Sequence, residues 1–403
     1  MKNSLKYTCI FGGGAVRGIS YVGAVKALRE FGVEIDSVAG SSVGALFAIL
    51  YALDYSCDEM KEIFLNFNFN MFKDINFPLG PDFAFSKGEV FLNFVRDLIE
   101  KKYYGDSYIK GENAPVNFSD IEKDLYILTC DLSNNTPFVF SKNNTPDFEV
   151  ALAVRISASL PGLMKPTEVD DKFLVDGDLI KSWPLWKTDV GLCGNNSRIL
   201  EFRLEGCRDS VVIKNPLDYL NTVFSSFSNF CTENIIETYQ KNDKFDYILI
   251  DTKNVLLIDF TMPVEKRLEL IQNGYDTTVT YFKEHLLNKK KNVLPKYKYV
   301  KTMLVDVERL LVSDQLEQSK NKLYELMANM YESLKFIDEC VYYEINEFKK
   351  DFIPDIKNFL FFKKMHPVSK TKHIKKLNSM IENLQMKCDE LSEYIRSCKK
   401  SIY

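Results

Sequence analysis

The sequence predicts an α/β protein, in which helices flank a sheet, with a helical module at the C-terminal end. Three observations predict this fold class. Short apolar strands alternate with amphipathic helices in the first half of the chain. Glycine-rich turns follow the first two of these strands, and heptad patterns fill the C-terminal part. The chain has 403 residues, which is enough for two to three domains and a large core.

Each expected strand is a short apolar run bounded by polar or turn residues. In chain order these runs are 5–11, 33–39, 126–130, 137–140, 173–175, 198–202 and 247–250. The segment 17–31 is expected to be a helix, because Ile19, Val22, Val25 and Leu28 recur at helical spacing. A second helix is expected from Val43 onward.

Two heptad patterns mark the C-terminal region, one from Leu323 to Val341 and the other from Ile374 to Ile402. A segment carrying Pro354 and Pro367 joins them, which favours an antiparallel helical hairpin of coiled-coil type. The alternative is that both helices simply cap the α/β core. We therefore expect an α/β domain over residues 1–290 and a helical module over 300–403 with a regulatory, targeting or partner-binding role.

The charge distribution is uneven. The net charge is −4, but residues 285–403 hold 23 Lys and Arg against 16 Asp and Glu, and the remainder holds 29 against 40. A basic helical region on an acidic body favours contact with an anionic membrane surface or an acidic protein activator, although a solvated basic face is the alternative. The segment 357–364 sets aromatic residues beside lysines, which suits a membrane interface. No nucleic-acid partner is expected.

The nine cysteines are scattered, without a CxxC pair or a His/Cys cluster. Neither a disulfide framework nor a zinc site is indicated, so we expect reduced thiols, no metal and no cofactor. The N-terminus enters a strand without the apolar region of a Sec-type signal, and no apolar stretch is long enough to span a bilayer. We therefore expect a cytoplasmic protein, peripheral at membranes; export as an effector by a non-Sec route is compatible with the same sequence.

The first glycine-rich turn is Gly12-Gly13-Gly14-Ala15-Val16-Arg17-Gly18. A dinucleotide fold needs G-x-G-x-x-G with an acid about twenty residues later, and Glu34 and Asp36 lie at that distance. However, Arg17 occupies the third glycine position, and Gly18 comes one residue late. The alternative is an oxyanion site, because glycines at a strand-to-helix turn let backbone N–H groups approach a reacting carbonyl. The backbone of Gly12, Gly13, Gly14 and Ala15 is the candidate oxyanion hole.

The second turn, Gly40-Ser41-Ser42-Val43-Gly44, fits the G-x-S-x-G pattern of a nucleophile elbow, with Ser42 as the nucleophile and Gly40 and Gly44 as the glycines of the turn. Such serines usually work with a histidine, but the chain has three histidines, His285, His366 and His373, and none is in the α/β section. A carboxylate is therefore the expected base, with His285 as the alternative.

Asp176 is the best candidate for this base. It follows an apolar strand and precedes Gly177, so its side chain is expected to leave the end of the sheet with little crowding. An aspartate can serve as a base when partial burial and a hydrogen bond from the serine hydroxyl raise its proton affinity. Alone, Asp-Gly is a common turn sequence. The assignment of Asp176 as the base therefore depends on the presence of the other two motifs.

With these three motifs, the sequence resembles the patatin-like phospholipase family. That family is marked by a glycine-rich oxyanion loop with a basic residue before its last glycine, a G-x-S-x-G elbow and a D-G-[GA] motif. Here these are segment 12–18 with Arg17, segment 40–44 with Ser42, and the segment that begins at Asp176. Segment 155–162 also resembles the family's approach to its aspartate. The helical region after about residue 300 lies outside the resemblance.

The resemblance implies a patatin-like sheet and a phospholipase A or lysophospholipase that acts on a phospholipid or lysophospholipid through a Ser-Asp dyad. Ser42 would be the nucleophile and Asp176 the general base, and Arg17 would brace the glycine loop or meet phosphate. The alternative is a catalytically idle or partner-activated patatin fold that binds a membrane or a protein. Two departures matter: Lys181-Ser182 stands where the family often has asparagines before Pro184, and Asp178 stands where the family has Gly or Ala. If it pointed inward, it would raise the pKa of Asp176; if outward, it would do nothing.

Overall fold

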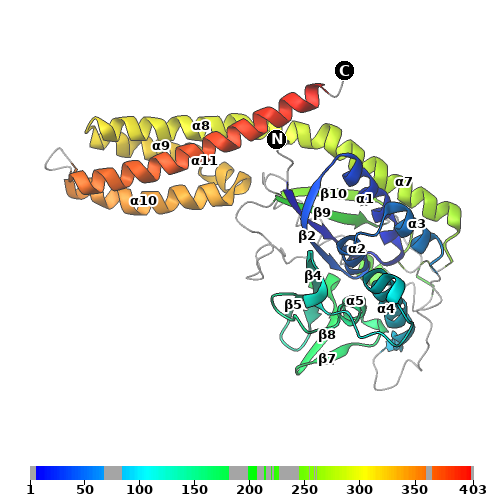
Figure 1. Ribbon diagram of the computed structural model, residues 1–403. Coiled ribbons are helices and arrows are strands. Elements are labelled where there is room, and N and C mark those ends of the chain that lie inside the picture. The colour runs from blue at the N-terminus through cyan, green and yellow to red at the C-terminus, as the bar shows by residue number, and fades with distance from the viewer. Residues whose placement is uncertain are drawn as a thin grey trace. The chain divides into compact units, whose positions relative to one another are not determined.

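The computed structural model describes residues 6–67, 84–180, 198–206, 213–214, 219, 222–226, 245–253, 255–257, 259, 261–359 and 365–400. The chain forms two compact units: an α/β unit that ends at Thr280 and a helical unit that begins at Tyr281. A mixed α/β sheet with flanking helices, followed by a long helical region, confirms the predicted fold class (Figure 1). None of the helices within the described ranges is long and apolar enough to cross a membrane.

An eight-stranded sheet forms the centre of the α/β unit among the described residues. In spatial order its main path is β10 (Phe245–Asp251), β9 (Arg198–Glu205), β1 (Lys6–Phe11), β2 (Glu34–Ser41), β4 (Asp124–Asp131), β8 (Lys172–Asp176) and β7 (Thr167–Val169), and β5 (Thr136–Ser141) pairs with β4 off this path. The first five strands run parallel, and β8, β7 and β5 join antiparallel. Every strand expected from the sequence overlaps one of these elements. A separate two-stranded sheet pairs β3 (Ala84–Ser86) with β6 (Gly162–Met164).

Helices pack against the sheet, and the parallel strands are nearly continuous runs of buried residues. The helices are α1 (Ser20–Glu30), α2 (Val43–Ala52), α3 (Cys57–Leu65), α4 (Glu89–Tyr104), α5 (Val150–Ser157) and α7 (Val264–Thr280). A short 3₁₀ helix, η1 (Ala15–Ile19), precedes α1 where the sequence predicted one continuous helix. Helix α2 is apolar on every side, so it is buried almost throughout against β1, β2 and β4.

Helices α1 and α7 approach each other closely through two glycines. A Cβ atom on Gly23 would lie 1.8 Å from the carbonyl oxygen of Ile271, and one on Gly274 would lie 1.9 Å from that of Ser20. Only residues without a side chain permit this approach, which holds α1 beside α7. Because η1 and α1 follow the glycine loop directly, their packing also fixes the loop at one end.

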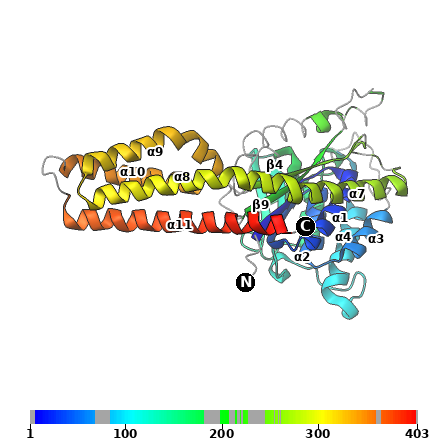
Figure 2. The same cartoon turned by 90° about the horizontal axis from the view of Figure 1, so that it is seen from above.

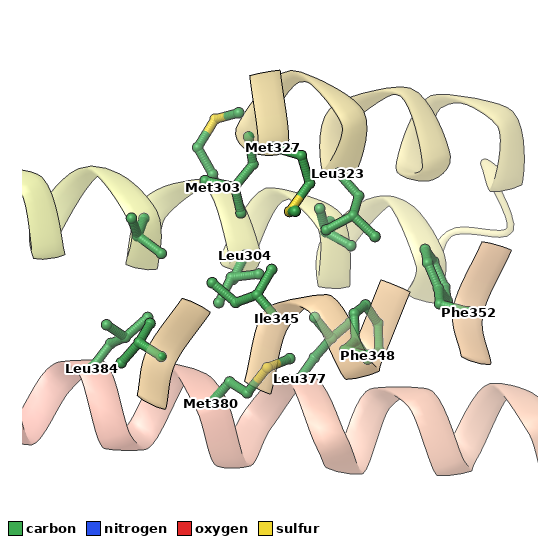
Figure 3. Packing of buried hydrophobic residues seen from close by; sticks show 14 of the residues in the cluster. Met303, Leu304, Leu323, Met327, Ile345, Phe348, Phe352, Leu377, Met380 and Leu384 are labelled. Carbon is green, nitrogen blue, oxygen red and sulfur yellow. The ribbon is translucent and has the colours of Figure 1, made fainter. Parts of the chain in front are cut away.

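The helical unit contains four long helices in its described part, α8 (Leu286–Val312), α9 (Leu316–Ile337), α10 (Glu339–Phe359) and α11 (Pro367–Lys400). Helix α8 packs against α9 and α11, and α10 packs against the same two helices (Figures 1 and 2). Their shared core is apolar, and residues from all four helices point toward one another in it (Figure 3). They include Met303 and Leu304, Leu323 and Met327, Ile345 and Phe348, and Leu377 and Leu384.

This arrangement corrects the expected hairpin. The heptad pattern from Leu323 to Val341 does not form one helix, because α9 ends and α10 begins around the buried Asp338. The Oδ1 atom of Asp338 accepts a hydrogen bond from the N–H of Val341 at 3.2 Å, the arrangement of a helix N-cap. The prolines do not mark a joining segment either: Pro354 lies inside α10 and Pro367 begins α11. Residues 360–364 of the aromatic and basic segment lie outside the described residues.

Candidate active site

The serine elbow joins β2 to α2 through a strained turn. Ser42 has φ 53° and ψ −128°, a positive φ that is uncommon for a residue other than glycine and is typical of functional turns. The two glycines of the motif make the turn sterically feasible. A Cβ atom on Gly40 would lie 2.1 Å from the oxygen of Gly44, and one on Gly44 would lie 2.0 Å from the oxygen of Phe11. The G-x-S-x-G pattern is therefore a backbone packing requirement in this protein.

Ser157, the last residue of α5, fixes the backbone of the elbow. The N–H of Ser42 donates to the Oγ atom of Ser157 at 3.0 Å and to its carbonyl oxygen at 3.1 Å. The hydroxyl of Ser157 in turn donates to the oxygen of Leu128 at 2.6 Å, so α5 and β4 both hold the turn. Sequence reasoning assigned Ser157 no role, because nothing local indicates a contact between residues 115 positions apart.

The register of β4 brings Asp176 to the elbow. In the β2–β4 pair, Ser41 lies opposite Leu128, and in the β4–β8 pair, Asp176 lies opposite the next residue, Thr129. Strand β5 occupies the other edge of β4, so β2 and β8 share one edge and meet there end to end. Ser42 follows the last residue of β2, and Asp176 is the last residue of β8. The two residues expected to form the dyad therefore lie at adjoining strand ends.

Asp176 is buried, with 1% of its surface exposed, and its surroundings are polar. Its N–H donates to the oxygen of Ser159 at 3.1 Å, and its Oδ1 atom accepts from the N–H of Asp178 at 2.8 Å. Such hydrogen bonds are what a buried carboxylate requires. After Asp176 the chain passes tightly over β4, since a Cβ atom on Gly177 would lie 2.4 Å from the oxygen of Leu128.

The glycine loop between β1 and η1 has one N–H directed at the site and one used in the sheet. The N–H of Gly12 donates to the oxygen of Phe202 at 2.9 Å, which occupies it in this arrangement. The N–H of Gly13 donates instead to the Oδ1 atom of Asp178 at 3.0 Å. The loop bends at Gly14 and Ala15, whose φ angles are 157° and 48°. Of the expected oxyanion donors, Gly13 is thus the one shown binding a negatively charged oxygen.

Asp178 connects the three motifs. Besides the N–H of Gly13, its Oδ1 atom accepts a hydrogen bond from the hydroxyl of Ser41, at 2.5 Å. The side chain thus points inward, but toward the glycine loop and the elbow, while its backbone N–H meets Asp176. Burial, followed by the charge of Asp178, raises the pKa of Tyr21, whose hydroxyl donates to the oxygen of Gly12 at 2.8 Å beneath the loop.

Arg17 and Gly18 support the loop from inside the protein. Arg17 is 2% exposed, and its Nε atom donates to the oxygen of Val255 at 2.7 Å, so it is not an exposed helix residue. A Cβ atom on Gly18 would lie 2.5 Å from the side chain of Val43, the first residue of α2. These contacts join the glycine loop to the beginning of the helix that follows Ser42.

All three histidines of the sequence lie beyond Thr280, in the helical unit, and the α/β unit contains none. His285 closes a π-helical turn (Tyr281–His285) between α7 and α8. His373 is buried in the helical unit, where its Nε2 atom pairs with the Oδ2 atom of Asp355 at 2.8 Å. The compact unit that carries Ser42 therefore offers carboxylates, but no imidazole, as a base.

The family model of patatin-like phospholipases matches residues 9–186. This part of the chain is a patatin-like phospholipase domain. The glycine loop, the elbow and Asp176 all lie within it. The helical unit lies outside the matched residues.

Two relatives and one solved structure show how far the likeness extends. The uncharacterized protein YqhO of Bacillus subtilis is 25% identical over 298 residues, which is 68% of this chain and 97% of that protein. Lysophospholipase nte1 of Aspergillus oryzae is 32% identical over 174 residues, 42% of this chain but only 10% of that protein. The crystal structure of VipD from Legionella pneumophila has a TM-score of 0.50 at 15% identity, covering 97% of this chain and 88% of that chain, which is a likeness of fold.

Proposed function

We propose that the protein is a lipid acyl hydrolase of the phospholipase A or lysophospholipase type, with Ser42 as nucleophile and Asp176 as general base. The observation that carries the proposal is the meeting of β2 and β8 on one edge of β4, which sets Asp176 beside the strained turn of Ser42. The patatin-like domain and a relative named as a lysophospholipase support the substrate class.

In the proposed reaction, the Oγ atom of Ser42 attacks the acyl carbonyl while Asp176 accepts its proton. The N–H of Gly13 and the positive end of α2 stabilise the tetrahedral oxyanion. Asp176 then returns the proton to the leaving alcohol, and the acyl group stays on Ser42. Water then attacks the acyl ester of Ser42 while Asp176 accepts its proton. The ester bond breaks, the proton returns to Ser42, and the fatty acid is released. The absence of histidine from the sequence of the α/β unit supports a carboxylate base.

The helical region is proposed to bring the enzyme to its substrate as a peripheral membrane element or to receive a protein activator. Its support is the net positive charge of residues 285–403, which contain 23 basic and 16 acidic residues. Near an anionic surface, basic residues of this kind each add roughly 1 kcal/mol of attraction. The proposed division of labour is therefore catalysis within residues 1–290 and targeting or activation within 300–403.

The test is the release of free fatty acid from phospholipid vesicles, either zwitterionic or mixed with anionic lipid, by wild type, Ser42→Ala and Asp176→Asn. We expect release by wild type, faster on the anionic vesicles, and a loss of about 10⁴-fold or more in both variants, since subtilisin loses comparable factors when single members of its catalytic triad are removed. Ser107→Ala and Asp106→Asn are matched controls, because both residues are exposed and belong to a short 3₁₀ helix, Gly105–Ser107, rather than to a strand.

Two results would count against parts of this proposal. Full activity of Asp176→Asn would remove it as the base and return His285 as the candidate. No release by wild type, even with cell extract added, would favour a catalytically idle fold. Release that appears only with extract would instead favour a partner-activated enzyme, and the contact of Asp178 with Gly13 is the observation that favours this form.

A further inference from the structure

The Oδ1 atom of Asp178 accepts the N–H of Gly13, the donor to which the proposed function assigns the reacting oxyanion. It accepts the N–H of Gly13 at 3.0 Å and the hydroxyl of Ser41 at 2.5 Å. Donors of an oxyanion hole stand about 2.7–3.1 Å from the oxygen that they stabilise, so the Gly13 contact has the geometry of a filled hole. The carboxylate also lies flat on the loop, since a Cβ atom on Gly13 would be 1.8 Å from Oδ2.

A carboxylate is a stronger ground-state partner for this N–H than an ester is. Hydrogen bonds to a charged acceptor are about twice as strong as those between neutral groups, and the carbonyl of an ester is neutral before attack. Once the oxyanion forms, two negative oxygens would compete for one donor and repel each other. An ester can therefore react well only if the side chain of Asp178 leaves Gly13.

The surroundings of Asp178 allow a charged side chain to stay there. Arg203 lies beside the same loop, with its Cδ atom 2.9 Å from where a Cβ atom on Gly12 would be. Burial lowers the pKa of Arg203, but Glu201, Tyr247 and Asp178 together raise it above its ordinary value; the positive charge near the carboxylate is itself paired with Glu201, at 2.5 Å. The D-G-[GA] motif places Gly or Ala at this position, and neither side chain could reach Gly13.

We propose that Asp178 is a built-in competitor for the oxyanion position, which holds the resting site closed until its carboxylate is displaced. The inference rests on the proposed function. The alternative for the same contacts is that Asp178 is a positioning residue, which holds the glycine loop against the elbow. The two roles predict opposite signs: removing a competitor accelerates the reaction, whereas removing a tie slows it.

The first test measures two reactions of Ser42 in the full-length protein: hydrolysis of a soluble p-nitrophenyl ester and covalent labelling by a fluorophosphonate. One oxyanion donor is worth about 10²–10³ in kcat, so we expect Asp178→Ala to raise both rates by roughly 10-fold or more, with Asp178→Asn between it and wild type. Ser41→Ala removes the second donor to Oδ1 and should also raise the rates, by less. Asp147→Ala, at an exposed aspartate, is the matched control and should change neither.

The second test needs no activity. Gly13 and Gly14 are the only glycines in the sequence that follow a glycine, so labelling glycine with both ¹³C′ and ¹⁵N selects their two amides from the spectrum. Loss of the carboxylate acceptor in Asp178→Asn should move the Gly13 amide proton upfield and leave Gly14 nearly unchanged. A Gly13 signal that does not move would overturn the contact, and with it the inference.

The outcomes separate the two proposals. Labelling of Ser42 in wild type that is unchanged or slower in Asp178→Ala and Ser41→Ala would overturn the competitor and leave the hydrolase proposal standing. No labelling in any variant would overturn the proposed function itself. Faster labelling in both variants, together with a shifted Gly13 amide, would support both proposals.

Discussion

At the elbow, polar and backbone contacts join segments far apart in the sequence: Ser42 with Ser157, and Asp178 with both Ser41 and Gly13, across 115, 137 and 165 positions. The helical unit is held differently, by apolar side chains shared among four helices (Figure 3). A hydrogen bond or a close backbone approach tolerates only a narrow range of distances and angles. Apolar contacts allow many arrangements, since cores tolerate swaps that conserve volume. We therefore expect conservative single substitutions to cost much stability or activity at the elbow and little stability in the helical core.

The comparison has one built-in exception, a buried polar cluster in the helical unit. Asp338, 1% exposed, accepts hydrogen bonds from the hydroxyl of Tyr297 at 2.8 Å and from the ammonium group of Lys387. With its cap on Val341, this residue connects α8, α10 and α11. A substitution of Asp338 should therefore cost more stability than a volume-conserving substitution elsewhere in this apolar core.

The largest effect is expected for Gly44→Ala. The new Cβ atom would lie 2.0 Å from the oxygen of Phe11, and since backbone meets backbone there, neither side can move cheaply. We expect a loss of about 3 kcal/mol or more in the free energy of unfolding, at the upper end of overpacking effects, together with loss of ester hydrolysis. Urea denaturation measures the first quantity.

Gly111→Ala is the matched control for this change. Gly111 has φ +78°, but a Cβ atom there would meet nothing within 4 Å, so the cost is that of the backbone conformation alone, about 1 kcal/mol. Equal losses of unfolding free energy in Gly44→Ala and Gly111→Ala would show that the elbow tolerates a side chain. The contrast between the elbow and the helical core would then fail.

A smaller effect is expected for Asp338→Ala, which removes one member of a buried charge pair and a helix cap. Lys387, whose side chain is 18% exposed, would lose its partner. Breaking a fully buried pair typically costs about 3–5 kcal/mol; because Lys387 is partly exposed, we expect a loss below that range, about 2 kcal/mol, in the free energy of unfolding. The measurement is again urea denaturation, and Leu377→Met, a volume-conserving change in the same core, should cost less than about 1.5 kcal/mol.

Comparing the stability costs of Asp338→Ala and Leu377→Met tests whether the polar cluster differs from the apolar core around it. If Leu377→Met cost as much as Asp338→Ala, the apolar core would be as exacting as the polar cluster. The contrast between the two regions would then have to be abandoned.

The sequence predicted well what is local. Strands and the glycine and serine turns follow from short apolar runs and from residues that suit a sharp turn, and each expected strand is present. It could not predict contacts made by pairing. The role of Ser157 depends on α5 reaching the elbow, and the inward direction of Asp178 depends on β8 sharing an edge of β4 with β2.

The helical region shows the opposite kind of error, in which a local signal was present but outweighed. An aspartate just before an apolar periodic run is a helix N-cap signal, and Asp338 lies between the heptad positions Ile337 and Val341, where it caps α10. The pattern was continued through it because the apolar spacing from Leu323 to Val341 was unbroken. The proline at Pro354, by contrast, is accommodated inside α10, which only the packed structure could show.

The smallest effect is expected at the surface of the α/β unit, where polar contacts are exposed. Glu59 completes a capping box at the start of α3, accepting the N–H of Ser56 at 2.6 Å, and also pairs with Lys102 at 2.9 Å. The Lys102 hydrogen bond first, and those of Ser56 next, lower the pKa of Glu59 from 4.5 to about 2. The folded state therefore keeps the charge at pH values where the unfolded state binds a proton.

The sign of the pH dependence follows. Because the folded pKa is the lower one, the contribution of Glu59 is complete above about pH 4.5 and is lost as the pH falls toward 2. We expect Glu59→Gln to cost about 0.5 kcal/mol at pH 7, because glutamine can keep the capping box but loses the charge that pairs with the partly exposed Lys102, and less at pH 3, as measured by urea denaturation at both values. Glu62→Gln, at an exposed position of the same helix, is the control. A cost for Glu59→Gln that is the same at both pH values would mean that its charge contributes nothing. The cap would then depend on fixed geometry alone, like the contacts of the elbow.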